Sequence, residues 1–141
     1  MPVIDPADGT MIGSVPSLSA AETAKALEGA AAAMEAWKRE PASKRSAILT
    51  RWRDLLVTHA EDLAAILTAE QGKPLAEARA EVAYGADYVA WFAGEAVRID
   101  GEILQSPSPD KRIMVLRQPV GLCAAITPWN FPIAMVTRKV A

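Results

Sequence analysis

The residues of this chain that could do chemistry gather near its end, in the segment TPWNFP from Thr127 to Pro132. Pro128 and Pro132 fix their own φ angles and restrict the residues before them, so this loop loses little entropy when it adopts one geometry. Asn130 lies at its centre. The side-chain amide could donate hydrogen bonds to an oxygen that gains negative charge during a reaction, as an oxyanion hole requires. It could equally close an Asx turn onto its own backbone, and the spacing does not decide between the two roles.

Three further side chains could do chemistry. Arg138 lies on an expected helix, where an arginine is commonly a solvated side chain. The single cysteine, Cys123, lies in the apolar run GLCAAIT, where a thiol tends to stay protonated, so we interpret it as a structural residue rather than a nucleophile. The single histidine, His59, ends a helical pattern and is expected to be a surface or capping group. One cysteine and one histidine leave no plausible metal site.

Composition and charge exclude several classes of protein. The 141 residues are 51% hydrophobic and 23% charged, as is usual for soluble globular proteins. The formal net charge is −2 and the basic residues are scattered among acidic ones, which argues against nucleic-acid binding. No apolar run approaches the roughly 20 residues that span a bilayer, and the N-terminus lacks the features of a signal peptide. We therefore expect a cytoplasmic protein that is not associated with membranes.

Most of the chain ahead of the TPWNFP loop has the pattern of helices. Residues 1–18 have turn residues between short apolar runs, which predicts a small hairpin or two edge strands. Residues 19–100 have apolar residues at helical spacing, interrupted at prolines and glycines. Ser19 and Glu22 have the spacing of a capping box at the first helix start. The pattern predicts four helices: the first over about 19–39, a second that begins after Ser43, a third that ends at Gly72, and a fourth over about 74–99.

The end of the chain has a different pattern. Alternating apolar residues over 101–118 predict a β-hairpin. Residues 119–141 contain the continuous apolar run Gly121–Thr127, as expected of a strand covered on both faces in a parallel sheet, and then a proline-led helix. Strand, loop and helix form half of a βαβ unit, so the expected fold class is α/β. The TPWNFP loop then lies at the carboxyl end of a strand, where open α/β sheets bind ligands.

Two features predict that the chain is a truncated piece of a larger fold. A parallel strand without neighbours leaves its backbone groups unpaired, and the final helix stops at Ala141 without a cap. The longest predicted helix also has, beside its stripe of small apolar residues, a second stripe formed by Tyr84, Tyr88 and Trp91. We interpret these aromatic residues as packing groups rather than a cofactor-binding set, and expect them to lack their partners.

Several segments together resemble the NAD(P)-dependent aldehyde dehydrogenase superfamily, and most of all its succinate-semialdehyde dehydrogenase branch. They are EQGKPLAEA, DYVAWFAGEAVRIDGE and QPVGLCAAITPWNFPIAMVTRK, with an early DPADGTMIGSVP that extends the likeness over essentially the whole chain. The resemblance implies the N-terminal part of an aldehyde dehydrogenase fold, in which helices and a β-hairpin lead into the first strand and helix of a Rossmann-like nucleotide-binding domain. Residues 101–118 resemble the family's oligomerisation strands, which implies a homodimer or homotetramer for a full-length protein.

The resemblance also implies a reaction with NAD or NADP as cofactor. In this family a cysteine thiolate attacks a small-molecule aldehyde, a hydride leaves for the cofactor, and water activated by a glutamate hydrolyses the thioester. The matching positions give Asn130 the oxyanion-hole role and give Arg138 the distal carboxylate of succinate semialdehyde. The residues implied to line the cofactor are Ile126, Thr127, Pro128, Trp129 and Asn130. The family's nucleophilic cysteine, general-base glutamate and ribose-binding lysine lie far downstream, so we expect these 141 residues alone to be inactive.

Other interpretations stay open. The chain could be a stand-alone helical interaction module that binds a partner through its apolar helix faces. It could also belong to the same enzyme class but act on another aldehyde, such as glutarate semialdehyde or an unbranched aliphatic one. The choice between NAD and NADP is not readable, because the residues that would meet the ribose 2′ position lie beyond Ala141. No GxGxxG pattern follows the predicted strand, so any nucleotide site is unconventional.

Overall fold

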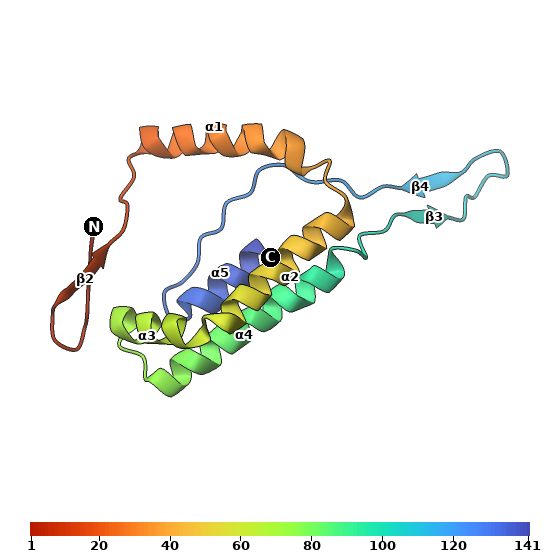
Figure 1. Ribbon diagram of the computed structural model, residues 1–141. Coiled ribbons are helices and arrows are strands. Elements are labelled where there is room, and N and C mark those ends of the chain that lie inside the picture. The colour runs from red at the N-terminus through yellow and green to blue at the C-terminus, as the bar shows by residue number, and fades with distance from the viewer.

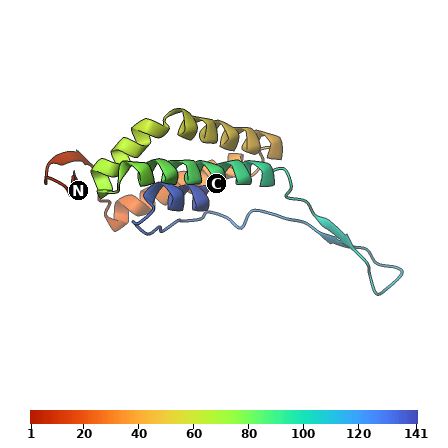
Figure 2. The ribbon, with the colours of Figure 1, turned by 90° about the horizontal axis from the view of Figure 1, so that it is seen from below.

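The computed structural model describes residues 1–141 and contains five helices and two small antiparallel sheets (Figure 1). Figures 1 and 2 show helices α2 to α5 lying together, with one hairpin projecting from one end and α1 lying apart at the top of Figure 1. The elements in chain order are β1 (Pro2–Ile4), β2 (Met11–Ser14), α1 (Ala20–Trp37), α2 (Ala42–Thr58), α3 (Ala60–Gln71), α4 (Leu75–Glu95), β3 (Glu102–Leu104), β4 (Ile113–Val115) and α5 (Pro132–Val140).

Helix α4 is the centre of the packed part, because α2, α3 and α5 each pack against it. Its stripe of small apolar residues is buried and forms most of the core with residues from α2 and α3. Gly85 allows α5 to approach closely, since a Cβ there would lie 3.2 Å from the Ile133 and Thr137 side chains. The buried α4 residues are Ala78, Glu81, Val82, Gly85, Ala86, Val89 and Ala93.

Local signals set the helix ends. The Ser19 side chain accepts a hydrogen bond from the Glu22 N–H, and the Glu22 carboxylate accepts one from the Ser19 N–H, so the predicted capping box is formed. Gly72 ends α3 in the left-handed conformation, with φ of 76°, as glycine allows without strain. Helix α4 ends at Glu95, four residues before its predicted end, because the Arg98 N–H bonds the Glu95 carbonyl in a tighter turn.

The predicted strand Gly121–Thr127 is not formed. These residues belong to the loop that leads from β4 back to the start of α5 (Figure 1), and residues 122–126 are exposed. The expectation was wrong for a physical reason: a parallel strand needs neighbours, and the strands of this chain pair only within the hairpins β1–β2 and β3–β4. None of the helices combines the length and apolarity needed to cross a bilayer.

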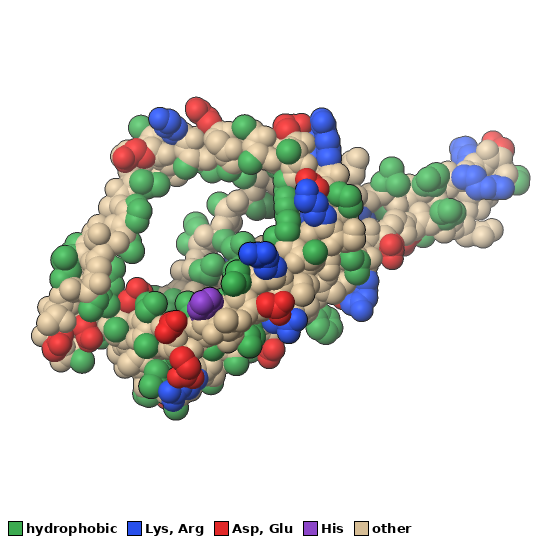
Figure 3. All heavy atoms as spheres, viewed as in Figure 1, with side chains coloured by type: hydrophobic (Ala, Val, Ile, Leu, Met, Phe, Trp, Pro, Cys, Tyr) green, Lys and Arg blue, Asp and Glu red, His purple; other side chains and the backbone are tan.

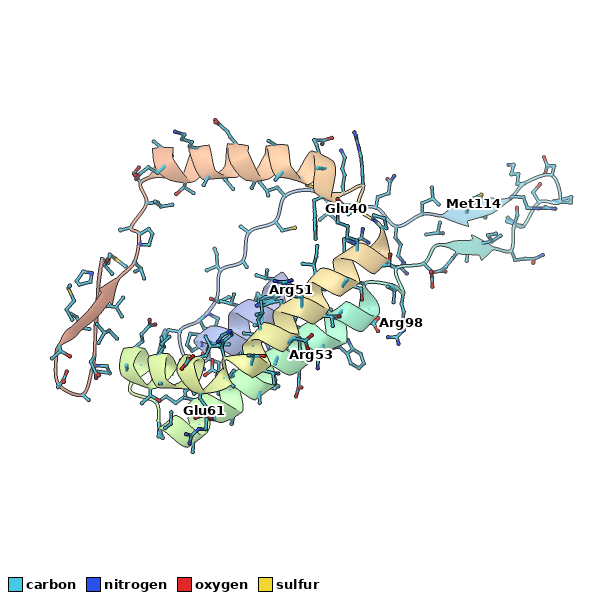
Figure 4. The ribbon with its side chains drawn as sticks, in the orientation of Figure 1. Glu40, Arg51, Arg53, Glu61, Arg98 and Met114 are labelled. Atoms are coloured by element: carbon cyan, nitrogen blue, oxygen red, sulfur yellow. The ribbon has the colours of Figure 1, made fainter.

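Many large apolar side chains are exposed, and Figure 3 shows hydrophobic side chains, in green, scattered over the face in view. Helix α1 buries no residue at all. In the projecting hairpin, Ile103 and Met114 are 77% and 66% exposed, and Figure 4 places Met114 on β4. Two of the aromatic residues of α4, Tyr84 and Trp91, are also exposed, as predicted, whereas Tyr88 is half-buried.

Candidate active site

The backbone of the TPWNFP loop is held by side chains from the connection between α3 and α4. Gln71 Nε2 donates to the Trp129 carbonyl at 2.8 Å, and Lys73 Nζ donates to the Asn130 carbonyl at 3.0 Å. The Lys73 ammonium also lies 4.3 Å from the centre of the Phe131 ring. Two successive carbonyls of the loop are therefore fixed by polar groups, and the prolines restrict the torsions around them.

Helix α5 begins at Pro132, as predicted, and its first turn is bound by a buried carboxylate. Glu81 of α4 is 2% exposed, and its Oε1 accepts hydrogen bonds from the Ile133 and Ala134 N–H groups at 2.9 and 3.3 Å. These N–H groups have no partner within the helix, and a negative charge is favourable at a helix N-terminus. The second oxygen, Oε2, is paired with Lys73 Nζ.

The side chain of Asn130 is exposed and makes no hydrogen bond within the chain. The Asx turn that the sequence left open is therefore not formed. An Asx turn needs the N–H group two residues further on, and here that residue is Pro132, which has none. The loop thus presents an unbound amide from a backbone that is fixed on both sides, which is the arrangement that donors to a developing oxyanion need.

Arg138 lies in the last turn of α5, half-buried against α4. Its Nη2 is 2.9 Å from Met135 Sδ, one turn earlier, so the guanidinium points back towards the start of the helix, where Asn130 lies. The guanidinium carbon is 5.6 Å from the Tyr88 ring centre, and Nη1 donates to Tyr88 Oη at 3.5 Å. No carboxylate of the chain pairs with Arg138.

The Tyr88 hydroxyl is also hydrogen-bonded to that of Tyr84, and the two rings are 4.7 Å apart between centres. This shared hydrogen bond raises the pKa of Tyr84 and lowers that of Tyr88, which the hydrogen bond from Arg138 lowers further. Tyr88 of the aromatic stripe therefore contacts Arg138 in addition to packing against Tyr84. About 9 Å of helix leads from Pro132 to Arg138, at 1.5 Å per residue, and Asn130 lies two residues ahead of that helix.

The segment ahead of Asn130 offers the implied cofactor an exposed surface. Ile126 and Trp129 are 92% and 80% exposed, Pro128 is exposed, and Thr127 is half-buried. Apart from Trp129, whose carbonyl Gln71 binds, the backbone groups of residues 122–129 have no partner within the chain. Exposed peptide groups can form hydrogen bonds with a ligand or with a further part of the protein, and the flat face of Trp129 can pack against either.

Cys123 and His59 lie outside this arrangement. Cys123 was expected inside a covered strand, but it is exposed, because the strand is absent, and its Sγ is 3.6 Å from the Gly121 carbonyl. His59 lies between α2 and α3 as their shared cap residue, with Nδ1 3.8 Å from Asp62 Oδ2. The chain contains no group of three or more His, Cys, Asp or Glu side chains placed to hold a metal ion.

Sequence reasoning missed the side chains that hold the loop, namely Gln71, Lys73 and Glu81. Glu81 gives the clearest signal, because it is a charged residue on the stripe of small apolar residues of α4, three positions after Ala78 and four before Gly85. A carboxylate on a buried helix face needs a partner. The pattern shows this need but not which distant groups meet it.

Known proteins resemble this chain over nearly its whole length. The model of the aldehyde dehydrogenase family matches residues 1–141. The chain belongs to the aldehyde dehydrogenase family. A succinate semialdehyde dehydrogenase of Acinetobacter baylyi is 54% identical over 140 residues, which are 99% of this chain and 29% of that protein. A glutarate-semialdehyde dehydrogenase of Pseudomonas putida is 53% identical over 97% of this chain and 28% of that protein.

Solved structures of other proteins share the fold of this aldehyde dehydrogenase chain. A crystal structure of an NADP-dependent enzyme of Escherichia coli superposes with a TM-score of 0.95 at 48% identity, covering 98% of this chain and 29% of the other. The chain thus spans less than a third of the length of these relatives. It matches their N-terminal part, as the sequence predicted, and its helices and hairpins have the arrangement found in their larger fold.

Proposed function

We propose that this chain forms the N-terminal part of an enzyme that oxidises succinate semialdehyde to the carboxylic acid with NAD or NADP. The observation that carries the proposal is the unbound amide of Asn130 on a loop whose backbone is fixed by Gln71 and Lys73. When a nucleophile attacks an aldehyde carbon, the carbonyl oxygen becomes an oxyanion. An amide held in place before the reaction stabilises that oxygen without reorganising, which lowers the barrier.

The cofactor would lie against residues 126–130. Trp129 and Ile126 offer apolar faces, and the unpaired peptide groups around them offer hydrogen bonds. Bound NAD or NADP would supply the hydride acceptor, while this segment would bind and orient it next to Asn130. The oxyanion amide and the hydride acceptor would then act on the same carbon atom. The relatives include an NADP-dependent enzyme, and nothing in these residues selects between the two cofactors.

Arg138 would bind the distal carboxylate of the substrate. Its guanidinium has no acidic partner in the chain and is held by Tyr88 and by Met135, which lies one turn nearer to Asn130 along the chain. Arginine can hold a carboxylate with two parallel hydrogen bonds, which lysine cannot. A semialdehyde with its carboxylate on Arg138 would direct its other end towards the oxyanion amide.

Replacing Arg138 should weaken the binding of an aldehyde that has a carboxylate but not of one that lacks it. In a complete enzyme, Arg138→Lys or Arg138→Ala is expected to raise KM for succinate semialdehyde about 10- to 100-fold, because a charge-assisted pair is weakened or lost. The matched control is an unbranched aliphatic aldehyde without a carboxylate, whose KM should change less than threefold. Steady-state kinetics with both aldehydes measures this difference. An unchanged KM for succinate semialdehyde would show that another residue binds the carboxylate.

Glutarate semialdehyde is the specific alternative substrate, because a relative of nearly equal similarity carries its name. It has the same two end groups and one more methylene, so Arg138 and Asn130 could serve it equally. Competition between the two semialdehydes in one assay would rank them. The interaction-module interpretation is less favoured, because it gives no reason for an unbound amide on an anchored loop.

A complete enzyme is needed for these tests, and we define the completed enzyme as this chain joined at Ala141 to the remaining sequence of the Acinetobacter relative. It is expected to oxidise succinate semialdehyde, whereas the 141-residue chain with NAD or NADP is expected to show no sustained turnover, before or after Cys123→Ser. Absorbance of the reduced cofactor measures both. A folded, cofactor-binding completed enzyme without activity would contradict the proposed function. Cys123-dependent turnover by the 141-residue chain would contradict the expectation that the nucleophilic cysteine lies downstream of it.

The full-length protein is further proposed to be a cytoplasmic homo-oligomer. The hairpin of β3 and β4 projects from the helices with its apolar side chains uncovered (Figures 1 and 3). An exposed two-stranded edge pairs readily with another sheet. The hairpin therefore offers a surface through which a second copy could be bound, as the family resemblance implies.

A further inference from the structure

A buried ion pair lies behind the candidate oxyanion loop. The side chains of Lys73 and Glu81 are 10% and 1% exposed, so both charges are largely removed from water. Such a pair is costly to desolvate, and well-packed apolar residues of similar volume often stabilise a fold as well or better. Core stability is therefore a weak reason for this pair, and its hydrogen bonds point to another.

Those hydrogen bonds all lead to the backbone around Asn130. The Lys73 ammonium donates to the Asn130 carbonyl, and the Glu81 carboxylate accepts from the Ile133 and Ala134 N–H groups. The pair thus binds the backbone before and after the two residues that follow Asn130, which are Phe131 and Pro132. Neither side chain touches the Asn130 amide, yet together they fix the peptide groups that determine where this amide points.

The rest of the neighbourhood strengthens this grip. The Phe131 ring lies against the Lys73 ammonium at 4.3 Å, which favours one position of both groups. The Gln71 side chain holds the preceding carbonyl, that of Trp129. The side chain of Asn130, by contrast, makes no hydrogen bond within the chain. The backbone on either side of Asn130 is thus held, while its amide stays free to bind a substrate oxygen.

We infer that Glu81 and Lys73 are positioning residues for the Asn130 amide: the buried pair ties the loop to the start of α5 and so sets where the oxyanion is stabilised. This inference rests on the proposed function of Asn130. The pair acts through the loop backbone and touches neither substrate nor cofactor. Loss of the pair should therefore lower kcat more than it changes the KM of the substrate.

Glu81→Gln in the completed enzyme tests the inference. The glutamine can keep an acceptor for the α5 N–H groups, but its NH₂ group then faces the Lys73 ammonium, so the link between the two ends of the loop is broken. Because displacements of about 1 Å can cost about 100-fold in rate, we expect kcat per active site to fall about 10- to 100-fold. Substrate KM should stay within threefold. Active-site titration corrects for misfolded protein.

A double-mutant cycle with Asn130→Ala distinguishes positioning from a general structural role. If Glu81 acts through the Asn130 amide, Glu81→Gln should change kcat less than threefold once that amide is gone. Glu61→Gln is the matched control, because Glu61, which Figure 4 labels, also pairs with a cation near the start of α4, namely Arg79, but this pair lies on the exposed surface. It should leave kcat unchanged.

The outcomes separate the two proposals. An equal loss of kcat from Glu81→Gln with and without Asn130 would overturn the positioning role, as would a wild-type kcat for Glu81→Gln when Asn130→Ala is severely impaired. A wild-type kcat for Asn130→Ala would instead overturn the proposed function, and the inference with it. If Glu81→Gln does not fold, the double variant Lys73→Met with Glu81→Gln, which leaves neither charge buried, takes its place in the same cycle. Lys73→Arg, which keeps the charge, should retain more activity than this double variant.

Discussion

Asn130→Ala is expected to lower kcat of the completed enzyme about 100- to 1,000-fold, the usual effect of removing one side-chain donor from an oxyanion hole. The amide would meet a full negative charge only in the transition state, so KM for succinate semialdehyde should change little. The backbone anchors are unaffected, because Gln71 and Lys73 bind main-chain carbonyls that alanine retains. Steady-state kinetics, with subunits counted by active-site titration, measures the effect.

Asn130→Asp is the sharper variant of the same experiment. Aspartate has nearly the same shape, but its carboxylate only accepts hydrogen bonds and repels a developing oxyanion. It should therefore be at least as slow as Asn130→Ala, although it fills the same space. A kcat above one third of the wild-type value for either variant would assign the oxyanion role to other donors. An aspartate variant much faster than the alanine variant would assign Asn130 a packing role.

The parts of the fold that the sequence predicted well depend on residues close together in the chain. The capping box needs only Ser19 and Glu22, the end of α3 needs only Gly72, and the start of α5 needs only Pro132. In each case one turn of backbone satisfies the signal, so no distant partner is required. The Asx turn could have been excluded in the same way, because Pro132 has no N–H group.

The parts that the sequence could not predict depend on distant partners. The segment Gly121–Thr127 has the composition of a covered strand, but strand formation requires neighbouring strands, and this chain supplies none to it. The Glu81 carboxylate binds amides more than fifty positions away, at Ile133 and Ala134. A helical pattern shows that Glu81 lies on a buried face, but α5 reaches it only because Gly85 lets the two helices approach closely.

The second large expected effect is a loss of stability when the buried pair of Lys73 and Glu81 is broken. Lys73→Met would leave the Glu81 carboxylate buried, with two backbone donors but no cation beside it. Removing one partner of a buried pair typically costs about 3–5 kcal/mol, because the remaining charge is neither solvated nor compensated. Lys73→Met should therefore lower the urea midpoint of the completed enzyme markedly, as measured by far-UV circular dichroism.

Two matched variants show whether the uncompensated charge is the cause. Arg79→Met removes the cation of the exposed pair with Glu61, whose carboxylate stays in water, so its midpoint should lie close to the wild-type value. Adding Glu81→Gln to Lys73→Met removes the stranded charge but keeps an acceptor for the α5 amides, and should restore more than half of the lost stability. If the double variant were instead no more stable than Lys73→Met, the loss would come from the broken bond to the Asn130 carbonyl. A restored midpoint with kcat still low would separate the two contributions of the pair: its charge balance stabilises the fold, and its link to the loop directs the amide.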